Sequence, residues 1–119
     1  MLELSDNEIG DDGARDLAML LRDKPSIIHL DLNSNHIGDE GIQELARALS
    51  NPHATLQRLY LEKNGEIGES GVNQLIEMLK VNRSLERLSL MGCMLNNPAR
   101  QALRQAAKEK PGLHLTVEP

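Results

Sequence analysis

Aromatic residues are almost absent from the sequence. Among its 119 residues there is one tyrosine, Tyr60, and there is no phenylalanine or tryptophan. Large rings usually supply much of the area that a protein core buries. Hydrophobic residues still make up 39% of the chain, and nearly all of them are aliphatic. The core of one small domain must therefore consist of many similar layers of leucine and isoleucine.

Cysteine and long apolar runs are scarce as well. Cys93 is the only cysteine, so no disulfide bond forms within the chain, which favours a reducing compartment. The sequence has no run of 18 apolar residues, about the length that a membrane-spanning helix needs. The first residues, Met1–Asp6, contain neither the basic region nor the apolar region of a signal peptide. We therefore expect a cytoplasmic protein with no membrane partner.

Basic residues are fewer than acidic residues. Lys and Arg number 13 against 18 Asp and Glu, so the net charge is −5 and the pI is about 5.3. Nucleic-acid-binding proteins present a dense Lys and Arg surface to the phosphates. The charge balance therefore predicts no nucleic-acid partner, although it leaves room for a local basic patch.

The sequence contains four copies of one pattern, in which leucines alternate with variable residues and an asparagine or cysteine follows. The copies are Leu2-x-Leu4-x-x-Asn7-x-Ile9, Leu30-x-Leu32-x-x-Asn35-x-Ile37, Leu59-x-Leu61-x-x-Asn64-x-x-Ile67 and Leu88-x-Leu90-x-x-Cys93-x-Leu95. The Asn or Cys position recurs every 28 or 29 residues. In the last three copies a further apolar residue stands three residues before the first leucine, at Ile27, Leu56 and Leu85.

A helical pattern follows each of these segments. Apolar pairs four residues apart share one helix face, at Leu17/Leu21, Leu45/Leu49, Leu75/Leu79 and Leu103/Ala107. The predicted N-caps, whose side-chain oxygens would bond to free backbone N–H groups, are Asp11, Asp39 and Asn97. Pro98 then falls at the first helical position, which tolerates its missing N–H. Each copy is thus predicted to be one strand, one turn and one helix.

The complete pattern, L-x-x-L-x-L-x-x-N/C-x-L, is the signature of leucine-rich repeats. A unit of 28–29 residues with a full helix resembles the ribonuclease-inhibitor-like class, which Nod-like receptors, the GTPase-activating protein of Ran and tropomodulin also use. The resemblance covers essentially the whole chain. It implies an α/β solenoid, a right-handed superhelix of about four repeats with parallel strands on the concave side and helices on the convex side. Such a stack curves because a helix, about 10 Å wide, takes more room than the strand spacing of about 4.8 Å.

The predicted organisation is a single leucine-rich-repeat domain over residues 1–119. Its repeats span about 1–26, 27–55, 56–84 and 85–112, and a closing edge strand follows at 113–117. Asn7, Asn35 and Asn64 are predicted to form a ladder of amides that bond to neighbouring backbone where the strands turn, because a buried amide needs such partners. Cys93 fits the same position as a weak donor, so its predicted role is structural.

The two ends of the chain differ. In the last helical pattern Arg100 and Arg104 replace Val72 and Ile76 of the preceding copy, which predicts a C-terminal cap on which nothing stacks. No capping unit precedes Leu2. We therefore expect either a fragment from the C-terminal end of a longer solenoid or a four-repeat protein whose first strand edge is covered by a partner.

The sequence contains no complete motif for metal binding, nucleotide binding or catalysis. Asp31-x-Asn33-x-Asn35 imitates the start of an EF-hand calcium loop, but His36 stands where the sharp turn needs glycine. The spaced glycines of the third copy are repeat glycines and lack the Gly-Lys-Ser/Thr of a phosphate loop. The four histidines lack the spacing of metal ligands, and no nucleophile with a matching base can be named. We expect no metal, no cofactor and no catalytic site, so the chain is predicted not to be an enzyme.

The variable positions of each L-x-L strand should face the concave side. Stacked copies then give three columns: His29, Arg58, Arg87; Glu3, Asp31, Tyr60, Ser89; and Ser5, Asn33, Glu62, Met91. Tyr and Arg are enriched at binding hot spots, and the resemblance implies that partners bind on this face. The predicted protein-binding residues are His29, Asp31, Arg58, Tyr60, Glu62, Arg87, Ser89 and Met91. An ordinary strand surface with no binding role is the alternative.

The predicted function is therefore a protein–protein interaction module that binds its partner through the concave strand face. The alternative is a C-terminal structural or capping fragment of a longer sensor, scaffold or GTPase regulator, with recognition elsewhere. The chain would be a monomer, or a dimer paired through its exposed N-terminal strand edge. The third copy carries one extra residue within Lys63–Ile67, which we interpret as a tolerated insertion, with a contact loop as the other interpretation.

Overall fold

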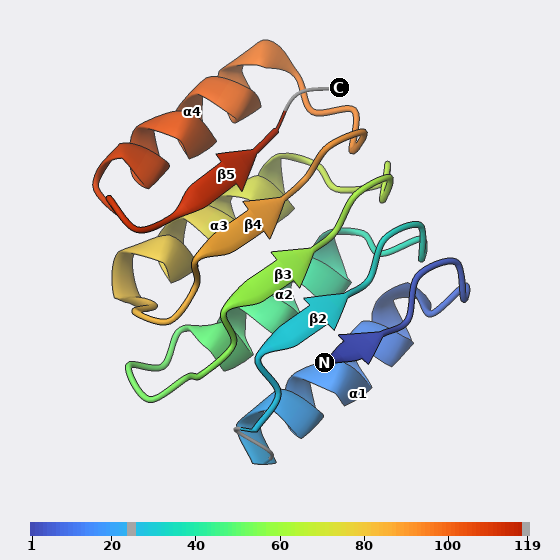
Figure 1. Ribbon diagram of the computed structural model, residues 1–119. Helices are drawn as coiled ribbons and strands as arrows, with labels where there is room; N and C mark the ends of the chain where they lie inside the picture. Colours follow the sequence, from blue (N-terminus) through green and yellow to red (C-terminus); the bar gives the residue numbers. More distant parts are fainter. Residues whose placement is uncertain (24–25, 118–119) are drawn as a thin grey trace.

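The computed structural model describes residues 1–23 and 26–117. Strands and helices alternate along these residues, as the repeat predicts. The strands are β1 (Leu2–Glu3), β2 (His29–Asp31), β3 (Arg58–Tyr60), β4 (Arg87–Ser89) and β5 (His114–Thr116). The helices are α1 (Gly10–Asp23), α2 (Asp39–Leu49), α3 (Glu69–Val81) and α4 (Asn97–Lys108). Figure 1 shows the helices in one layer behind the sheet, so that they cover only one of its two faces.

The strands form one parallel sheet in the order β1-β2-β3-β4-β5. Each strand pairs with the strand of the next copy, because the constant repeat length returns the chain to the same position one strand further along. The register partners are the first leucines of the copies, Leu2 with Leu30, Leu30 with Leu59, Leu59 with Leu88, and Leu88 with Leu115 of the closing strand. The predicted α/β solenoid of about four repeats is confirmed, and so is its closing strand.

The core lies between the sheet and the helices. Two leucines of each central strand segment point into it and are at most 1% exposed: Leu30, Leu32, Leu59, Leu61, Leu88 and Leu90. Buried helix residues meet them from the other side, among them Ile42, Leu45, Val72, Leu75 and Leu103. Each fully buried leucine contributes roughly 1.5–3 kcal/mol. Leu2, Leu4, Leu17 and Leu21 of the first copy are only partly buried, since this copy has a neighbour on one side only.

The predicted asparagine ladder is present where the strands turn. Asn64 is fully buried, and its Oδ1 accepts hydrogen bonds from the backbone N–H groups of Asn35 and Ile37, each at 3.0 Å. Asn35 repeats this contact one copy earlier, where its Oδ1 accepts from the N–H groups of Asn7 and Ile9. The amide groups of both asparagines donate to backbone carbonyls on either side of them. The ladder therefore joins each copy to the next at backbone level.

The aspartates predicted as N-caps cap the helix of the following copy instead. The N-caps of α2 and α3 are Gly38 and Gly68, which have no capping side chain. Asp11 Oδ1 accepts from the N–H groups of Gly38 and Gly41, at 2.7 and 3.0 Å. The prediction was wrong about the partner because it considered only residues nearby in sequence, whereas the start of the next helix lies beside this carboxylate.

Asp39 makes the same contact for α3, since its Oδ1 accepts from the N–H groups of the next copy at 2.7 and 2.9 Å. The start of α4 follows a different rule. Asn96, and not the predicted Asn97, is its N-cap, and Asn96 Oδ1 accepts from the N–H of Ala99 at 2.9 Å. The helix therefore begins at Asn97, and Pro98 lies one residue further inside the first turn than the sequence predicted.

The extra residue of the third copy changes its turn without breaking the ladder. In the first, second and fourth copies a left-handed residue follows the ladder position, namely Glu8, His36 and Met94. Within the corresponding described loop of the third copy, the residues Gly65 and Glu66 have no positive φ, and Glu66 pairs with Gly38 in a parallel bridge. Gly65 and Glu66 are both exposed. This geometry fits a tolerated insertion; a contact role for the loop stays a prediction.

Candidate binding face

The uncovered side of the sheet carries the side chains that alternate with the buried leucines, and we call it the strand face. Its first column follows the strand register and contains His29, Arg58, Arg87 and His114. Its second column contains Glu3, Asp31, Tyr60, Ser89 and Thr116. Backbone hydrogen bonds continue the ladder past the strand ends and align a third column, which contains Ser5, Asn33, Glu62 and Met91. The residues of each predicted column are thus confirmed as neighbours on adjacent strands.

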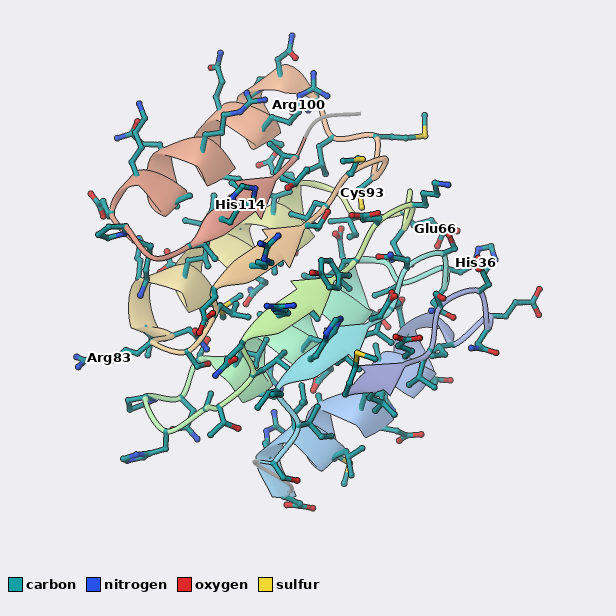
Figure 2. The ribbon with its side chains drawn as sticks, in the orientation of Figure 1. His36, Glu66, Arg83, Cys93, Arg100 and His114 are labelled. Atoms are coloured by element: carbon teal, nitrogen blue, oxygen red, sulfur yellow. The ribbon has the colours of Figure 1, made fainter. Side chains whose placement is uncertain are left out.

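His114 is a member of the first column that the prediction omitted. It lies on β5 opposite Arg87, and Figure 2 shows its side chain on the strand face. The sequence analysis predicted a closing strand here, but it did not extend the first column to that strand. The alternation of Leu113, Leu115 and Val117 with polar residues was the signal that could have found it.

An aromatic pair occupies the middle of the strand face. The rings of His29 and Tyr60 pack in a tilted arrangement, with their centroids 5.0 Å apart and an interplanar angle of 57°. Tilted ring pairs of this kind contribute about 0.5–1.5 kcal/mol beyond the area that they bury. Both side chains are partly exposed. The contact between the two rings restricts the conformations of both side chains. Met91, which lies two residues after the end of β4 and is 41% exposed, adds apolar area to the same face.

The carboxylates of the strand face are partly engaged by their own neighbours. Asp31 Oδ1 accepts from the backbone N–H of Asn33 at 3.0 Å. The Glu62 carboxylate accepts a short hydrogen bond from the hydroxyl of Ser89. Ser89 itself is only 4% exposed, so on this face its hydroxyl holds the Glu62 carboxylate in place and is itself shielded from solvent.

The two arginines of the first column are exposed and carry no ion pair with any residue in the described parts of the chain. The ion pairs that do form there lie on helices, between residues three apart: Asp12–Arg15, Glu44–Arg47 and Glu77–Lys80. Arg58 and Arg87 are direct register partners on β3 and β4. Two unpaired guanidinium groups are therefore presented side by side.

Cys93 has the structural role that its position in the repeat predicts. It is 1% exposed, and its Sγ lies 2.9 Å from the carbonyl oxygen of Leu61, to which the thiol donates. Burial raises the pKa of the Cys93 thiol above its ordinary value, although backbone hydrogen bonds from Asn64 and Lys63 oppose this. A protonated, buried thiol is a poor nucleophile and a poor metal ligand. Across the described residues, no cluster of three or more His, Cys, Asp or Glu side chains forms that could hold a metal ion.

The raised pKa of Cys93 has a consequence for stability at high pH. The unfolded chain releases this proton at a lower pH than the folded chain does, so the contribution of the protonated thiol is constant below about pH 9 and declines as pH rises toward the folded pKa. We expect the stability difference between the native protein and Cys93→Ala to shrink between pH 7.5 and 10.5. Urea unfolding of both proteins at the two pH values measures this difference, and a constant value would contradict it.

A pocket on the helix side was not predicted. It has a volume of about 460 Å³ and lies between the N-terminal halves of α3 and α4, where Ile67, Val72, Met94, Leu95, Pro98 and Ala99 line it together with polar residues. Met94 stands at this pocket and is 82% exposed. The pocket belongs to the layer opposite the strand face, so it adds nothing to the columns described above.

Comparisons with known proteins agree with this geometry. The family model described as Leucine Rich repeat matches residues 2–18 and 24–46, which include β1, β2 and the larger part of each of the helices α1 and α2. The comparison with curated proteins found no match. None of the helices formed by the described residues is long and apolar enough to cross a membrane. The family match to the first two repeats, the four aligned copies and the parallel sheet that they form lead to one conclusion: the chain folds as an α/β solenoid of leucine-rich repeats.

Proposed function

We propose that the strand face binds a protein partner, in agreement with the general use of leucine-rich repeats as interaction modules. The observation that supports this most is the pre-ordered centre of the face, where the His29–Tyr60 ring pair lies beside unpaired Arg58 and Arg87. Tyr and Arg are the residue types that most often dominate binding energy, because they combine a large contact area with specific polar contacts.

The contacting residues in this proposal are His29, Asp31, Arg58, Tyr60, Glu62, Arg87 and Met91, with Ser89 supporting Glu62. We propose binding without catalysis. The Ser89 hydroxyl donates to the Glu62 carboxylate, but Ser89 is only 4% exposed, so a substrate would not reach this hydroxyl. The full helix in every repeat, 11 to 14 residues long, further supports the ribonuclease-inhibitor-like class.

The proposed cytoplasmic location rests on the single buried thiol, which suits a reducing compartment. The free edge of β1 would allow a dimer, and light scattering during size-exclusion chromatography distinguishes it from a monomer.

Selection from a random peptide library tests the binding function. Peptides that bind the native protein are measured against the double variant Tyr60→Ala/Arg87→Glu, and we expect at least about a tenfold loss of affinity, because the variant removes two hot-spot side chains. Arg22→Glu on the exposed side of α1 is the control and should bind as the native protein does. Circular dichroism and the melting temperature establish that each variant is folded. Equal affinity of the folded double variant for all selected peptides would refute the proposal.

A further inference from the structure

The first column of the strand face is a row of four nitrogen-bearing side chains on four neighbouring strands, His29, Arg58, Arg87 and His114. Strands lie about 4.8 Å apart, so the two arginines start from backbone positions separated by one strand spacing. Like charges directly opposite each other on a sheet are destabilising. The fold therefore holds a repulsive pair at the centre of its uncovered face, within a chain whose net charge is −5.

None of the nearby carboxylates in the described parts of the chain forms an ion pair with the arginines of this row. Asp31, in the second column, accepts a hydrogen bond from the backbone N–H of Asn33. Glu62, in the third column, accepts one from the hydroxyl of Ser89. Glu3 lies on β1, two strands away from Arg58. Glu86, just before Arg87, is exposed and forms no ion pair with a described residue. Of the acidic groups around the row, none is thus bonded to either guanidinium group.

We propose that this row binds the acidic run of an extended peptide, with the carboxylates of the peptide paired to Arg58 and Arg87. The inference rests on the proposed function and names the chemical class of its partner. The guanidinium group presents two parallel N–H donors that match the two oxygens of a carboxylate, which makes arginine well suited to this role.

The dimensions of the row define the length of the acidic run. From His29 to His114 there are three strand spacings, or about 14 Å. An extended peptide advances about 3.4 Å per residue, so a run of about four acidic residues laid across the strands spans the row. The His29–Tyr60 ring pair lies alongside the His29 end. A leucine next to the acidic run would bury apolar area against these rings.

The surroundings of the row favour a peptide over a nucleic acid. The row is short, and the second and third columns beside it contain Glu3, Asp31 and Glu62. A long polyanion would pass over these carboxylates and meet repulsion. Stacking of successive bases needs several exposed rings, whereas the strand face has one aromatic residue besides its histidines.

Fluorescence anisotropy tests the inference with a fluorescein-labelled peptide that contains Glu-Glu-Glu-Glu-Leu. We expect this peptide to bind the native protein and to bind the variant Arg58→Gln/Arg87→Gln about tenfold more weakly. Added salt should weaken binding to the native protein and have little effect on binding to the variant. The control Arg22→Gln/Arg83→Gln removes the same charge from exposed positions off the strand face and should bind as the native protein does.

Three results would overturn the inference. They are equal binding of the peptide in which glutamine replaces every glutamate, equal affinity of the two double variants, and tighter binding of a 20-nucleotide polyuridylate than of the acidic peptide. The proposed function has a separate test. If library peptides without acidic residues lose affinity for Tyr60→Ala/Arg87→Glu, the strand face is a protein-binding face with a different partner class. If no peptide distinguishes that variant from the native protein, both proposals fail together.

Discussion

Replacement of Asn64 by alanine is expected to lower the free energy of unfolding by about 3–5 kcal/mol, through loss of hydrogen bonds and not of packing. The amide serves two backbone N–H groups of the preceding copy and the carbonyls of Leu32 and Leu61, all within 3.1 Å. Asn64 is 0% exposed, so water does not reach these groups when the amide is removed. A buried polar backbone group left without a partner costs about 1–3 kcal/mol, and partial relaxation reduces the sum.

The size of this loss matters because a domain of this length is stabilised by only about 5–15 kcal/mol in total. Urea or thermal unfolding followed by circular dichroism measures it, and a decrease of about 15 °C in melting temperature is the corresponding thermal effect. Asn7→Ala is the matched control. Asn7 holds the same repeat position, but it is exposed and its amide bonds only to the carbonyls of Leu4 and Ser5. Water replaces those bonds, so the loss should stay below about 1 kcal/mol. Equal losses for the two variants would show that burial of the ladder is not what makes it stabilising.

The repeat made much of the fold predictable, since four copies of one length can pair in one register only. Once Leu30, Leu59 and Leu88 are equivalent, parallel pairing follows, and the residues between the leucines form the columns of the strand face. The ladder was predictable for a related reason. A polar residue that recurs among leucines is expected to be buried wherever neighbouring copies cover it, and a buried amide must bond to the backbone beside it.

The contacts between neighbouring copies were not predicted correctly, because the rules for helix capping consider only residues close in sequence. Capping rules consider a side chain and the next three residues, and they assigned Asp11 to its own helix. In the folded chain Asp11 accepts from Gly38, 27 residues later, because stacking brings the two helix starts together. Asn82 was missed for a similar reason. It lies in the connection between α3 and β4, where polar residues are usually exposed, yet it is 2% exposed and donates to the carbonyl of Leu49 at the end of α2.

For the candidate site, the sequence predicted which residues share a face but not how they bond to one another. The prediction treated Ser89 as a contact residue, although its hydroxyl is occupied by Glu62. The rings of His29 and Tyr60 pair diagonally, between the first and the second column. This contact depends on side-chain conformations, which the repeat pattern does not predict. The repeat register identified the columns, whereas the exposure and the hydrogen-bond partners of each member could be obtained only from the structure.

The second large effect is expected from Asp39→Ala, which should lower the free energy of unfolding by about 2–3 kcal/mol. One carboxylate oxygen, Oδ1, accepts from two backbone N–H groups at the start of α3, those of Gly68 and Gly71. The first N–H groups of a helix have no partner within the helix, and the N-cap of α3 is a glycine without a side chain. Removal of Asp39 therefore leaves two donors of the next copy without an acceptor. Equilibrium unfolding in urea measures the loss.

Glu40→Ala is the control for this prediction, because Glu40 lies in the same first turn of α2 but is exposed, and its loss should be within about 0.5 kcal/mol. The close approach of the carboxylate also explains the glycine at position 71, where a Cβ atom would lie 2.5 Å from Asp39 Oδ1. Gly71→Ala must push this oxygen away, so the losses from Asp39→Ala and Gly71→Ala should overlap, and the double variant should lose less than their sum. Strictly additive losses, or a loss for Glu40→Ala as large as for Asp39→Ala, would show that the carboxylate does not join the two repeats through the start of α3.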